Sequence, residues 1–380
     1  MNILFLHSSS DLYGASKVLI DVVRVVKKNG HNPIVVLSEM GPLSKLLENE
    51  NIKVYIIRLG ILRKKYFTLI GIANRIKYIL KAKKELIQLC LDKKVETIYS
   101  NTSAVMVGGL VAKTLHIRHI FHIHEIIIKP KLLARVINNY IVRSSENIIA
   151  VSYAVAKNID KESNNKHITV IHNGISLPAF TSKKSLKKEL NINKKDLVLG
   201  MIGRVSQGKG QHYFIDIAVE IMKINPFLKI ILVGDAYPGY EHLENEIDLK
   251  IKASGLSTNF IQLGYRTDIV EILNTLDIFI LPSTQPDSFP TVILEAMACR
   301  KPIITTIRGG ASEMVENNLS GLYIPFDDVH KAVSIVKSLL LDEKKRRFFG
   351  EVAYQRVASN FSLTAFEDRI MTLINQCYEK

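Results

Sequence analysis

The chain has 380 residues, of which 47% are hydrophobic, and this length suits two domains with their own cores better than one. Its net charge of +15 would suit nucleic acid, an anionic membrane surface or a phosphorylated small substrate, and composition does not choose among them. The N-terminal run MNILFLHSSS is too short and too weakly basic for a signal peptide, and no segment has the roughly 20 apolar residues of a transmembrane helix, so we expect a soluble cytoplasmic protein.

Apolar strand-like runs alternate with amphipathic segments, which predicts parallel sheets covered by helices. Asn2–His7 is predicted to form a buried strand, followed by the turn SSSDLYGAS and a helix from about Lys17 to Lys28. Further strands are predicted at Asn32–Leu37, Val54–Ile57, Glu96–Ser100, Ile120–His124, Asn147–Val151 and Thr169–Ile171. Residues 1–181 therefore read as one doubly wound, Rossmann-like domain.

The polar, lysine-rich segment 182–195 (SKKSLKKELNINKK) has the composition of an exposed linker, so we expect the domain boundary there. In residues 196–358, strands are predicted at Leu197–Ile202, Leu228–Val233, Phe260–Leu263, Ile278–Leu281 and Pro302–Thr305, each before a helical pattern. These residues form a second Rossmann-like domain. The amphipathic segment 359–380 is predicted to be a helix that returns to the first domain.

The three cysteines, Cys90, Cys299 and Cys377, are widely spaced and form no cluster of the metal-binding type. We expect reduced, packed thiols.

A glycine-bearing turn follows the first strand of the second domain, with the sequence GRVSQGKG at 203–210. A helix N-terminus, glycines that allow close backbone approach, and the charges of Arg204 and Lys209 could together hold a diphosphate. The turn lacks the GxxxxGK[ST] pattern of a Walker A loop. Taken alone, glycine with basic residues on a loop is more often an ordinary solvated turn than a binding site.

A second group of polar residues follows the strand at Ile278–Leu281, within STQPDSFPTVILEAMA. Asp287 falls on the loop and Glu295 on the following helix, so that one carboxylate can face a sugar while the other faces another part of the same ligand. A solvated loop aspartate and a surface glutamate would show the same spacing.

The combination of GRVSQGKG with DSFPTVILEAMACRKPII some eighty residues later resembles the donor domain of family 4 glycosyltransferases of the GT-B fold. The resemblance extends over nearly the whole chain. Its further motifs are LYGAS at 12–16, NTS at 101–103, HIHE at 122–125, HNGI at 172–175, VGD at 233–235, LGYRTD at 263–268, LDIFILPS at 276–283 and RGGASEMVENNLSGLYIP from Arg308. It implies two Rossmann-like domains facing a central cleft and a retaining transfer of a sugar from a nucleotide-diphosphate donor.

The resemblance also implies roles for residues of the second domain. Arg204 and Lys209 would neutralise the donor diphosphate, Asp287 would contact hydroxyls of the transferred sugar, and Glu295 would bind the ribose. The remaining positions implied to bind the donor are Gly203, Gly264, Tyr265, Phe289 and Thr291, with backbone groups near Gly264 and Tyr265 meeting the base.

In the first domain, the resemblance places Gly14 and Ala15 against the donor phosphates and His124 against the transferred sugar, with His124 and Glu125 lining the cleft. Without the resemblance, His124 and His122 would be read as partly buried polar residues of a strand end.

Two positions depart from the family pattern. The paired-carboxylate motif usually begins with glutamate, whereas here it begins with the shorter Asp287, which weakens any inference about the sugar. Pro290 stands where glycine is common, which fixes φ near −65° and removes a backbone donor.

The chain contains no Asp-x-Asp motif, so the usual carboxylate pair for a divalent metal is absent and we expect metal-independent transfer without a cofactor beyond the donor. A UDP-sugar is favoured over a GDP-sugar as donor, and a glycan or lipid-linked acceptor is expected, in bacterial surface polysaccharide synthesis. An epimerase or a phosphorylase on a similar fold is the alternative within this class.

Residues 63–94 have the composition of a basic amphipathic helix that could lie on an anionic membrane, placing the protein peripherally on the inner face of the plasma membrane. A solvated helix would have the same composition. The basic residues concerned are Arg63, Lys64, Lys65, Arg75, Lys77, Lys81, Lys83 and Lys84.

A nucleic-acid-binding protein is the competing interpretation of the charge, but the chain has no Trp and no RNP-like or helix-turn-helix signature. A dinucleotide-dependent oxidoreductase is disfavoured because the first turn lacks GxGxxG.

Overall fold

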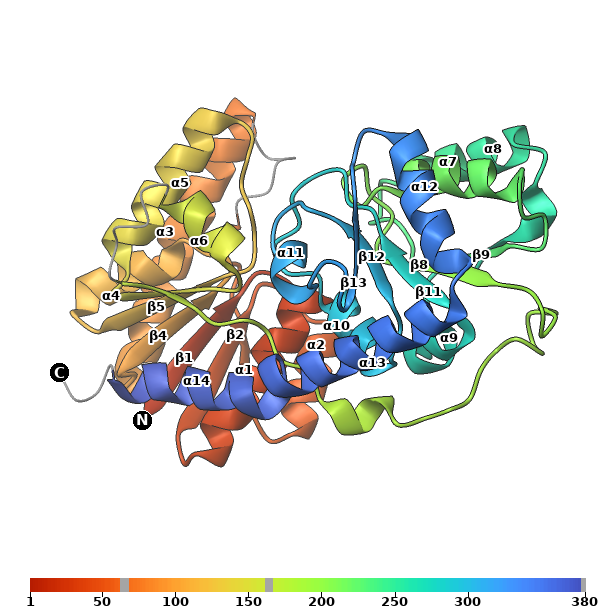
Figure 1. Ribbon diagram of the computed structural model, residues 1–380. Coiled ribbons are helices and arrows are strands. Elements are labelled where there is room, and N and C mark those ends of the chain that lie inside the picture. Colours follow the sequence, from red (N-terminus) through yellow and green to blue (C-terminus); the bar gives the residue numbers. More distant parts are fainter. Residues whose placement is uncertain (62–67, 161–166, 377–380) are drawn as a thin grey trace. The chain divides into compact units, whose positions relative to one another are not determined.

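The computed structural model describes residues 1–61, 68–160 and 167–376. Its contacts divide the chain into two compact units (Figure 1). Unit 1 comprises Met1–Asn173 together with Phe366–Lys380, and unit 2 comprises Gly174–Ala365. Each unit is built from a parallel sheet with helices, as the alternating pattern predicts.

The sheet of unit 1 has seven parallel strands in the order β3-β2-β1-β4-β5-β6-β7. The strands are β1 (Asn2–His7), β2 (Asn32–Leu37), β3 (Lys53–Ile56), β4 (Thr97–Asn101), β5 (Arg118–Ile123), β6 (Asn147–Ala150) and β7 (Ile168–Val170). The central strands are buried along nearly their whole length, because helices cover both faces of such a sheet. The predicted strands occur here with ends shifted by at most two residues, and His124 follows β5 instead of ending it.

The helices of unit 1 connect these strands. They are α1 (Gly14–Lys28), α2 (Pro42–Asn49), α3 (Leu69–Asp92), α4 (Val107–Leu115), α5 (Lys131–Ser144), α6 (Tyr153–Ile159) and the C-terminal α14 (Leu363–Gln376). Side-chain caps begin two of them, since the Thr68 hydroxyl accepts from Gly71 N–H and the Ser152 hydroxyl from Val155 N–H. From Phe366 onward α14 belongs to unit 1.

The sheet of unit 2 has six parallel strands in the order β10-β9-β8-β11-β12-β13. They are β8 (Val198–Ile202), β9 (Lys229–Val233), β10 (Phe260–Gln262), β11 (Ile278–Leu281), β12 (Ile303–Thr306) and β13 (Gly321–Ile324). The strand β13 is not among those predicted, because it is short and opens on a glycine. A Cβ at Gly321 would lie 2.2 Å from the Ile303 carbonyl oxygen, so the missing side chain is what lets β13 pair with β12.

Helices again follow the strands of unit 2. They are α7 (Gln211–Met222), α8 (His242–Ala253), α9 (Ile269–Thr275), α10 (Thr291–Ala298), α11 (Ala311–Met314), α12 (Val329–Leu340) and α13 (Glu343–Asn360), with the 3₁₀ turns η2 (Leu177–Phe180) and η3 (Ser257–Asn259).

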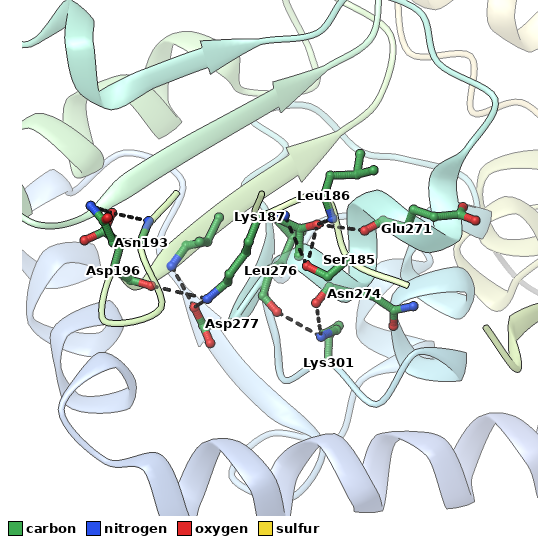
Figure 2. A network of polar contacts seen from close by, with 12 residues as sticks. Ser185, Leu186, Lys187, Asn193, Asp196, Glu271, Asn274, Leu276, Asp277 and Lys301 are labelled. Atoms are coloured by element: carbon green, nitrogen blue, oxygen red, sulfur yellow. Dashed lines mark hydrogen bonds and ion pairs between the residues drawn. The ribbon is translucent and has the colours of Figure 1, made fainter. Parts of the chain in front are cut away.

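The segment 182–195, predicted to be a linker, lies inside unit 2, and the division falls between Asn173 and Gly174. Figure 2 shows the polar contacts that hold it there. Leu186 N–H donates to the Thr275 hydroxyl at 2.8 Å, and Lys187 pairs with Asp277 at 3.5 Å. A lysine-rich composition indicates that side chains are exposed to solvent, but it does not indicate whether the segment packs on a domain. The sequence therefore could not distinguish a linker from a segment packed on α9 and β11.

The partly buried ammonium of Lys301 lies in the same network and donates to the Leu276 carbonyl at 2.9 Å (Figure 2). Burial lowers the pKa of this lysine, while Asp277 partly offsets the effect.

Cys90 and Cys299 are buried free thiols, and burial raises the pKa of Cys90 to about 12 and that of Cys299 to about 11. Both are therefore packing residues. Cys377 lies outside the described residues. Over residues 1–61, 68–160 and 167–376, no helix is both long enough and apolar enough to cross a membrane.

Candidate functional site

In unit 2, the strand order reverses between β8 and β11. The connections leave β8 toward β9 on one side and β11 toward β12 on the other, so the loops that follow these two strands diverge. Open parallel sheets bind ligands at such a point, at the carboxyl ends of the strands. The loop after β8 is 203–210 and the loop after β11 is 282–290, which are the two segments that carry the donor-type motifs.

Backbone contacts hold these two loops against each other. Thr284 N–H donates to the Gly208 carbonyl at 2.9 Å. Gly210 has a φ of 87°, and a Cβ there would lie 2.0 Å from the Pro282 carbonyl oxygen, so both its conformation and its packing require glycine. The glycines of GRVSQGKG thus bring a basic loop onto an acidic one.

The basic and acidic side chains of these loops meet directly. Lys209 Nζ donates to Asp287 Oδ2 in a short ion pair. The Lys209 side chain is 27% exposed and the Asp287 side chain 16%, so the pair is partly shielded from water but open to a ligand. The Asp287 backbone is fixed as well, because its carbonyl accepts from Gly310 N–H at 2.8 Å.

Arg204 lies on the same loop and stacks on an aromatic ring. Its Cζ is 3.1 Å from the centroid of the Tyr237 ring, and its carbonyl accepts from Gln211 Nε2 at 2.9 Å. The stacking orients the guanidinium, whose N–H donors lie in its plane. Tyr237 was not predicted, and nothing in its sequence context marks it.

A cavity of about 310 Å³ lies at the ends of β8, β9 and β10. Gly203, Gly234 and Gly264, each just after one of these strands, are part of its lining. Gly234 has a φ of 126°, and a Cβ there would lie 2.2 Å from the Gly203 carbonyl oxygen. The polar lining is Gln211, Asp235, Glu244, Asp248 and Gln262. A mixed apolar and polar cavity next to a basic loop suits a planar polar ring attached to a phosphate.

The other predicted donor residues fall near these loops but differ in exposure. Thr291 opens α10, with Pro290 before it at φ −72°, and Glu295 lies one turn further. Tyr265 is 56% exposed. Phe289 is 4% exposed and its ring centroid is 5.8 Å from that of Phe361, so its side chain packs in the core and only its backbone can meet a ligand.

Unit 1 has its own reversal of strand order, between β1 and β4. The residues at this point form a polar network that is mostly buried. His7 Nε2 lies 3.0 Å from Ser16 Oγ, which donates to Asp11 Oδ1 at 2.9 Å. Asn101, the last residue of β4, contacts both His7 Nδ1 and His124 Nε2. Ser16 and Asn101 belong to motifs of the sequence but had no predicted role, and His7 had none either.

The hydrogen bonds of Asn101 define the proton position on His124. Asn101 Nδ2 is 3.1 Å from the Ala15 carbonyl, which can only accept, so the amide nitrogen must face Ala15. The opposite amide atom, Oδ1, is 2.9 Å from His124 Nε2, which must therefore carry the proton. Burial, with His122 and His7 nearby, lowers the pKa of His124 well below its usual range, so the ring is neutral and Nδ1 is an acceptor.

His122 and Glu125 flank His124 and differ in role. His122 is fully buried and its Nδ1 lies 2.7 Å from the Tyr99 hydroxyl, while burial lowers its pKa to about 3. His122 is thus a core residue. Glu125 accepts from the Ser103 amide and hydroxyl, both at 3.1 Å, and burial raises its pKa despite these bonds. His124 is the half-buried histidine of HIHE, and its Nδ1 can accept a hydrogen bond.

Gly14 and Gly203 share an unusual property. Neither has a positive φ, and a Cβ added at either would meet no atom within 4 Å. Packing and backbone conformation therefore do not require glycine at these two positions. A ligand that approaches the backbone closely would require glycine there. Among the residues that the structure describes, no three His, Cys, Asp or Glu side chains gather as a metal site would need.

Two family models match the chain, one in each half. The model described as Glycosyltransferase Family 4 matches residues 13–177, and the model described as Glycosyl transferases group 1 matches residues 182–356. Two parallel-sheet Rossmann-like units define the GT-B class of proteins, which confirms the predicted fold class. Within this class, the chain belongs to the family 4 glycosyltransferases.

Two curated relatives indicate the range of the family. The chain is 26% identical to the lipopolysaccharide core biosynthesis mannosyltransferase LpsB of Rhizobium meliloti, over 60% of this chain and 64% of the relative. It is 36% identical to the N,N'-diacetylbacillosaminyl-diphospho-undecaprenol alpha-1,3-N-acetylgalactosaminyltransferase of Campylobacter jejuni, over 48% of this chain and 47% of the relative. The matches thus span from about half to just under two thirds of these relatives.

A solved structure matches over the full length. The Anabaena protein HepE in complex with UDP and glucose has a TM-score of 0.84 and 26% sequence identity, with 99% of this chain and 100% of that chain covered. HepE has also been solved with UDP-glucose.

Proposed function

We propose that this protein transfers a sugar from a nucleotide-diphosphate donor to a glycan or lipid-linked acceptor in bacterial surface polysaccharide synthesis, with retention at the anomeric carbon and without a metal. The observation that carries the proposal is the ion pair of Lys209 with Asp287 at the reversal point of unit 2, with Arg204 on the same loop as Lys209 and a cavity whose lining includes three glycines. The relatives that act on lipopolysaccharide and on undecaprenol diphosphate sugars support this class of acceptor.

In the proposed reaction, the bond between the sugar and the diphosphate breaks, and negative charge grows on the leaving group. Arg204 and Lys209 would stabilise that charge, with backbone N–H groups of the loop 203–210. Lys209 is held by Asp287 before a ligand binds, so the donor would share or displace this pair while Asp287 turns to sugar hydroxyls. Same-face attack assisted by the leaving phosphate would give retention without a protein nucleophile, so Asp287 and Glu295 are not assigned the roles of a retaining-glycosidase pair.

The remaining roles follow from local geometry. The cavity lined by Gly203, Gly234 and Gly264 would take the nucleobase, and Glu295 the ribose. His124 would accept a hydrogen bond from a hydroxyl of the transferred sugar through Nδ1, while Gly14 and Ala15 would approach the phosphates. UDP is the proposed nucleotide because HepE has been solved with UDP and with UDP-glucose.

The test is a thermal-shift panel of UDP-, GDP- and ADP-sugars. A ligand at 100 times its Kd stabilises the folded state by about 2.7 kcal/mol, so UDP-sugars should raise the Tm by several degrees more than the others. The variant Lys209→Ala should lose most of the shift, whereas Lys223→Ala, which removes an exposed lysine of the same unit, should keep it. The absence of stabilisation by every nucleotide sugar would contradict the proposal.

Metal independence and retention have separate readouts. Donor turnover should be the same in EDTA as in Mg²⁺, and the anomeric coupling constant of the product should match that of the donor sugar. A strict requirement for Mg²⁺ would contradict the first expectation, and an inverted product the second.

We further propose that α3 docks on an anionic membrane. Ile70 and Leu80 are 78% and 57% exposed on this helix, and Lys77, Lys81 and Lys84 are exposed along it. Apolar side chains among lysines suit the boundary of an acidic bilayer. Arg63, Lys64 and Lys65, which were predicted to contribute, lie outside the described residues.

Vesicle co-sedimentation tests the membrane proposal. Binding should require acidic lipid and fall with salt, and Leu80→Ser should weaken it. Leu249→Ser, which removes a leucine that is 65% exposed in unit 2, is the matched control. Binding that is indifferent to lipid charge and salt would contradict the proposal.

A further inference from the structure

A second cavity, of about 230 Å³, lies in unit 1 at the carboxyl ends of β1, β2 and β3. Its lining is Ser8, Ser38, Glu39, Arg58, Gly60, Ile61 and Arg75. Ser8 follows β1, Ser38 and Glu39 follow β2, Arg58 and Gly60 follow β3, and Arg75 lies on α3. None of these residues takes part in the polar network around His7 and His124 or in the donor site of unit 2.

The two arginines of this cavity contact the ring of the same tyrosine. The Cζ atoms of Arg58 and Arg75 each lie 4.9 Å from the centroid of the Tyr78 ring, and Arg58 Nη1 donates to the Tyr78 hydroxyl at 2.9 Å. Two guanidinium groups repel each other, so sharing one ring concentrates positive charge that an anion would stabilise. Arg58 forms no ion pair with any residue in the described part of the chain.

The backbone after β3 is built to hold this arrangement. Gly60 has a φ of 69°, and a Cβ there would lie 2.6 Å from Ile79 Cγ1 and 2.8 Å from the Ile79 backbone nitrogen. Only glycine therefore allows the loop that carries Arg58 to lie directly on α3, which carries Arg75 and Tyr78. The two cations come from segments separated in sequence and are brought together by this contact.

The rest of the lining adds hydroxyls and one carboxylate. The hydroxyl oxygen of Ser38 is buried and has no hydrogen-bond partner among the described residues, which is costly unless a ligand satisfies it. Glu39 is exposed and can accept from hydroxyl groups. The cavity is smaller than the roughly 300–1,000 Å³ typical of drug-sized ligands, and suits a phosphate with part of an attached sugar.

We propose that this cavity binds the phosphate of a glycosyl phosphate, with Arg58 and Arg75 on the phosphate and Glu39 and the serines on sugar hydroxyls. Guanidinium forks match phosphate oxygens in pairs, which point-like lysines do not. The inference rests on the proposed transferase function in one respect, since it assigns the ligand as the acceptor. The site would then select acceptors that carry a phosphate next to the sugar.

Calorimetric titration with N-acetylglucosamine 1-phosphate tests the site. The Lys209→Ala chain is used so that the phosphate affinity of the donor loop is reduced, and methyl N-acetylglucosaminide is the uncharged comparison. The glycosyl phosphate should bind, and the uncharged sugar should bind at least about tenfold more weakly, because hydrogen bonds to a charged group are the strong ones.

Variants then separate the two arginines from general charge. Arg58→Ala and Arg75→Ala should each raise the Kd by about 10- to 100-fold. Lys53→Ala removes a cation at the opposite end of β3 and should change the Kd less than twofold. A Kd unchanged in both arginine variants, with their Tm intact, would overturn the assignment.

A lipid headgroup is the other source of a phosphate. Vesicles of phosphatidylglycerol with the same variants distinguish it: if Arg58→Ala and Arg75→Ala abolish vesicle binding but leave the glycosyl phosphate Kd unchanged, the acceptor assignment is wrong. The proposed transferase function is read separately, by the UDP-sugar thermal shift of Arg58→Ala in the chain that retains Lys209. That shift should equal the shift of the unmodified protein, so either proposal can fail without the other.

Discussion

The strand-order reversals of the two units carry opposite kinds of polar chemistry. In unit 1 the residues at this point are mostly buried, and the neutral His124 is held as an acceptor through Asn101 and Ala15. In unit 2 the corresponding loops bear charges, with Lys209 on Asp287 and Arg204 stacked on Tyr237. The same topology thus supports a site around a neutral imidazole in one unit and a charged site in the other.

Lowering the pH should destabilise unit 1 more than unit 2, and this is the largest effect that we expect. Burial lowers the pKa of His119 to about 4 and that of His122 to about 3, against about 6.5 in an unfolded chain. Their contribution to stability is therefore complete above pH 6.5 and is lost as the pH falls toward these values. By pH 4.5 unit 1 should lose on the order of 5 kcal/mol.

Hydrogen exchange, corrected for the intrinsic effect of pH, measures the two units separately. Peptides from β4 and β5 should lose protection between pH 6.5 and 4.5 before those from β8 and β11. If unit 2 opens first, the buried histidines are not what limits stability in acid.

Turnover should depend most on the charged loop of unit 2. Lys209→Ala should lower kcat by on the order of 100-fold or more, because it removes a cation from the leaving diphosphate, and Arg204→Ala should do the same. The measurement is initial-rate donor turnover, with Lys223→Ala as the control for net charge. Unchanged kcat in either variant would refute its assigned role.

Burial in unit 1 also disfavours the charged form of a carboxylate, that of Asp21. Burial raises the pKa of Asp21, on α1, to about 6, with Glu367 of α14 adding to the rise and Arg24 opposing it. A raised acid pKa means that the folded state loses stability as the pH rises from about 4 through 6. Asp21→Asn should therefore stabilise the protein by about 2 kcal/mol at pH 7.5 and hardly at all at pH 4.

Chemical denaturation at these two pH values measures the effect of Asp21→Asn. Glu220→Gln, which removes an exposed carboxylate of unit 2, is the matched control. An equal gain at both pH values would show that the effect does not come from the raised pKa.

The smallest effect is expected where unit 1 orients His124. Asn101→Leu and His124→Phe should each lower kcat/KM by about tenfold, since each removes one neutral hydrogen bond to the sugar, directly or through the ring orientation. The double variant should be no worse than either single variant, because both remove the same interaction. Losses that multiply would mean that Asn101 acts independently of His124.

Much of this protein could be predicted from its residues in order. The strands Asn32–Leu37 and Ile278–Leu281 occur as predicted, because continuous apolar runs between turns specify buried parallel strands locally. The glycines and cations of GRVSQGKG likewise identified the basic loop of unit 2. The conformational freedom of a glycine and the charge of a lysine or arginine are properties of the single residue, so they can be read from the sequence.

Other features depended on contacts between distant segments. The sequence alone determined the positions of most strands along the chain, the family and the basic loop 203–210. Tertiary structure decided that 182–195 packs on unit 2, that Tyr237 carries Arg204, that Tyr78 gathers Arg58 and Arg75, and that His124 is neutral with its proton on Nε2. The physical reason is that the charge, tautomer and orientation of a side chain depend on its burial and on its partners. Burial and partners are set by contacts between distant segments and not by the local sequence.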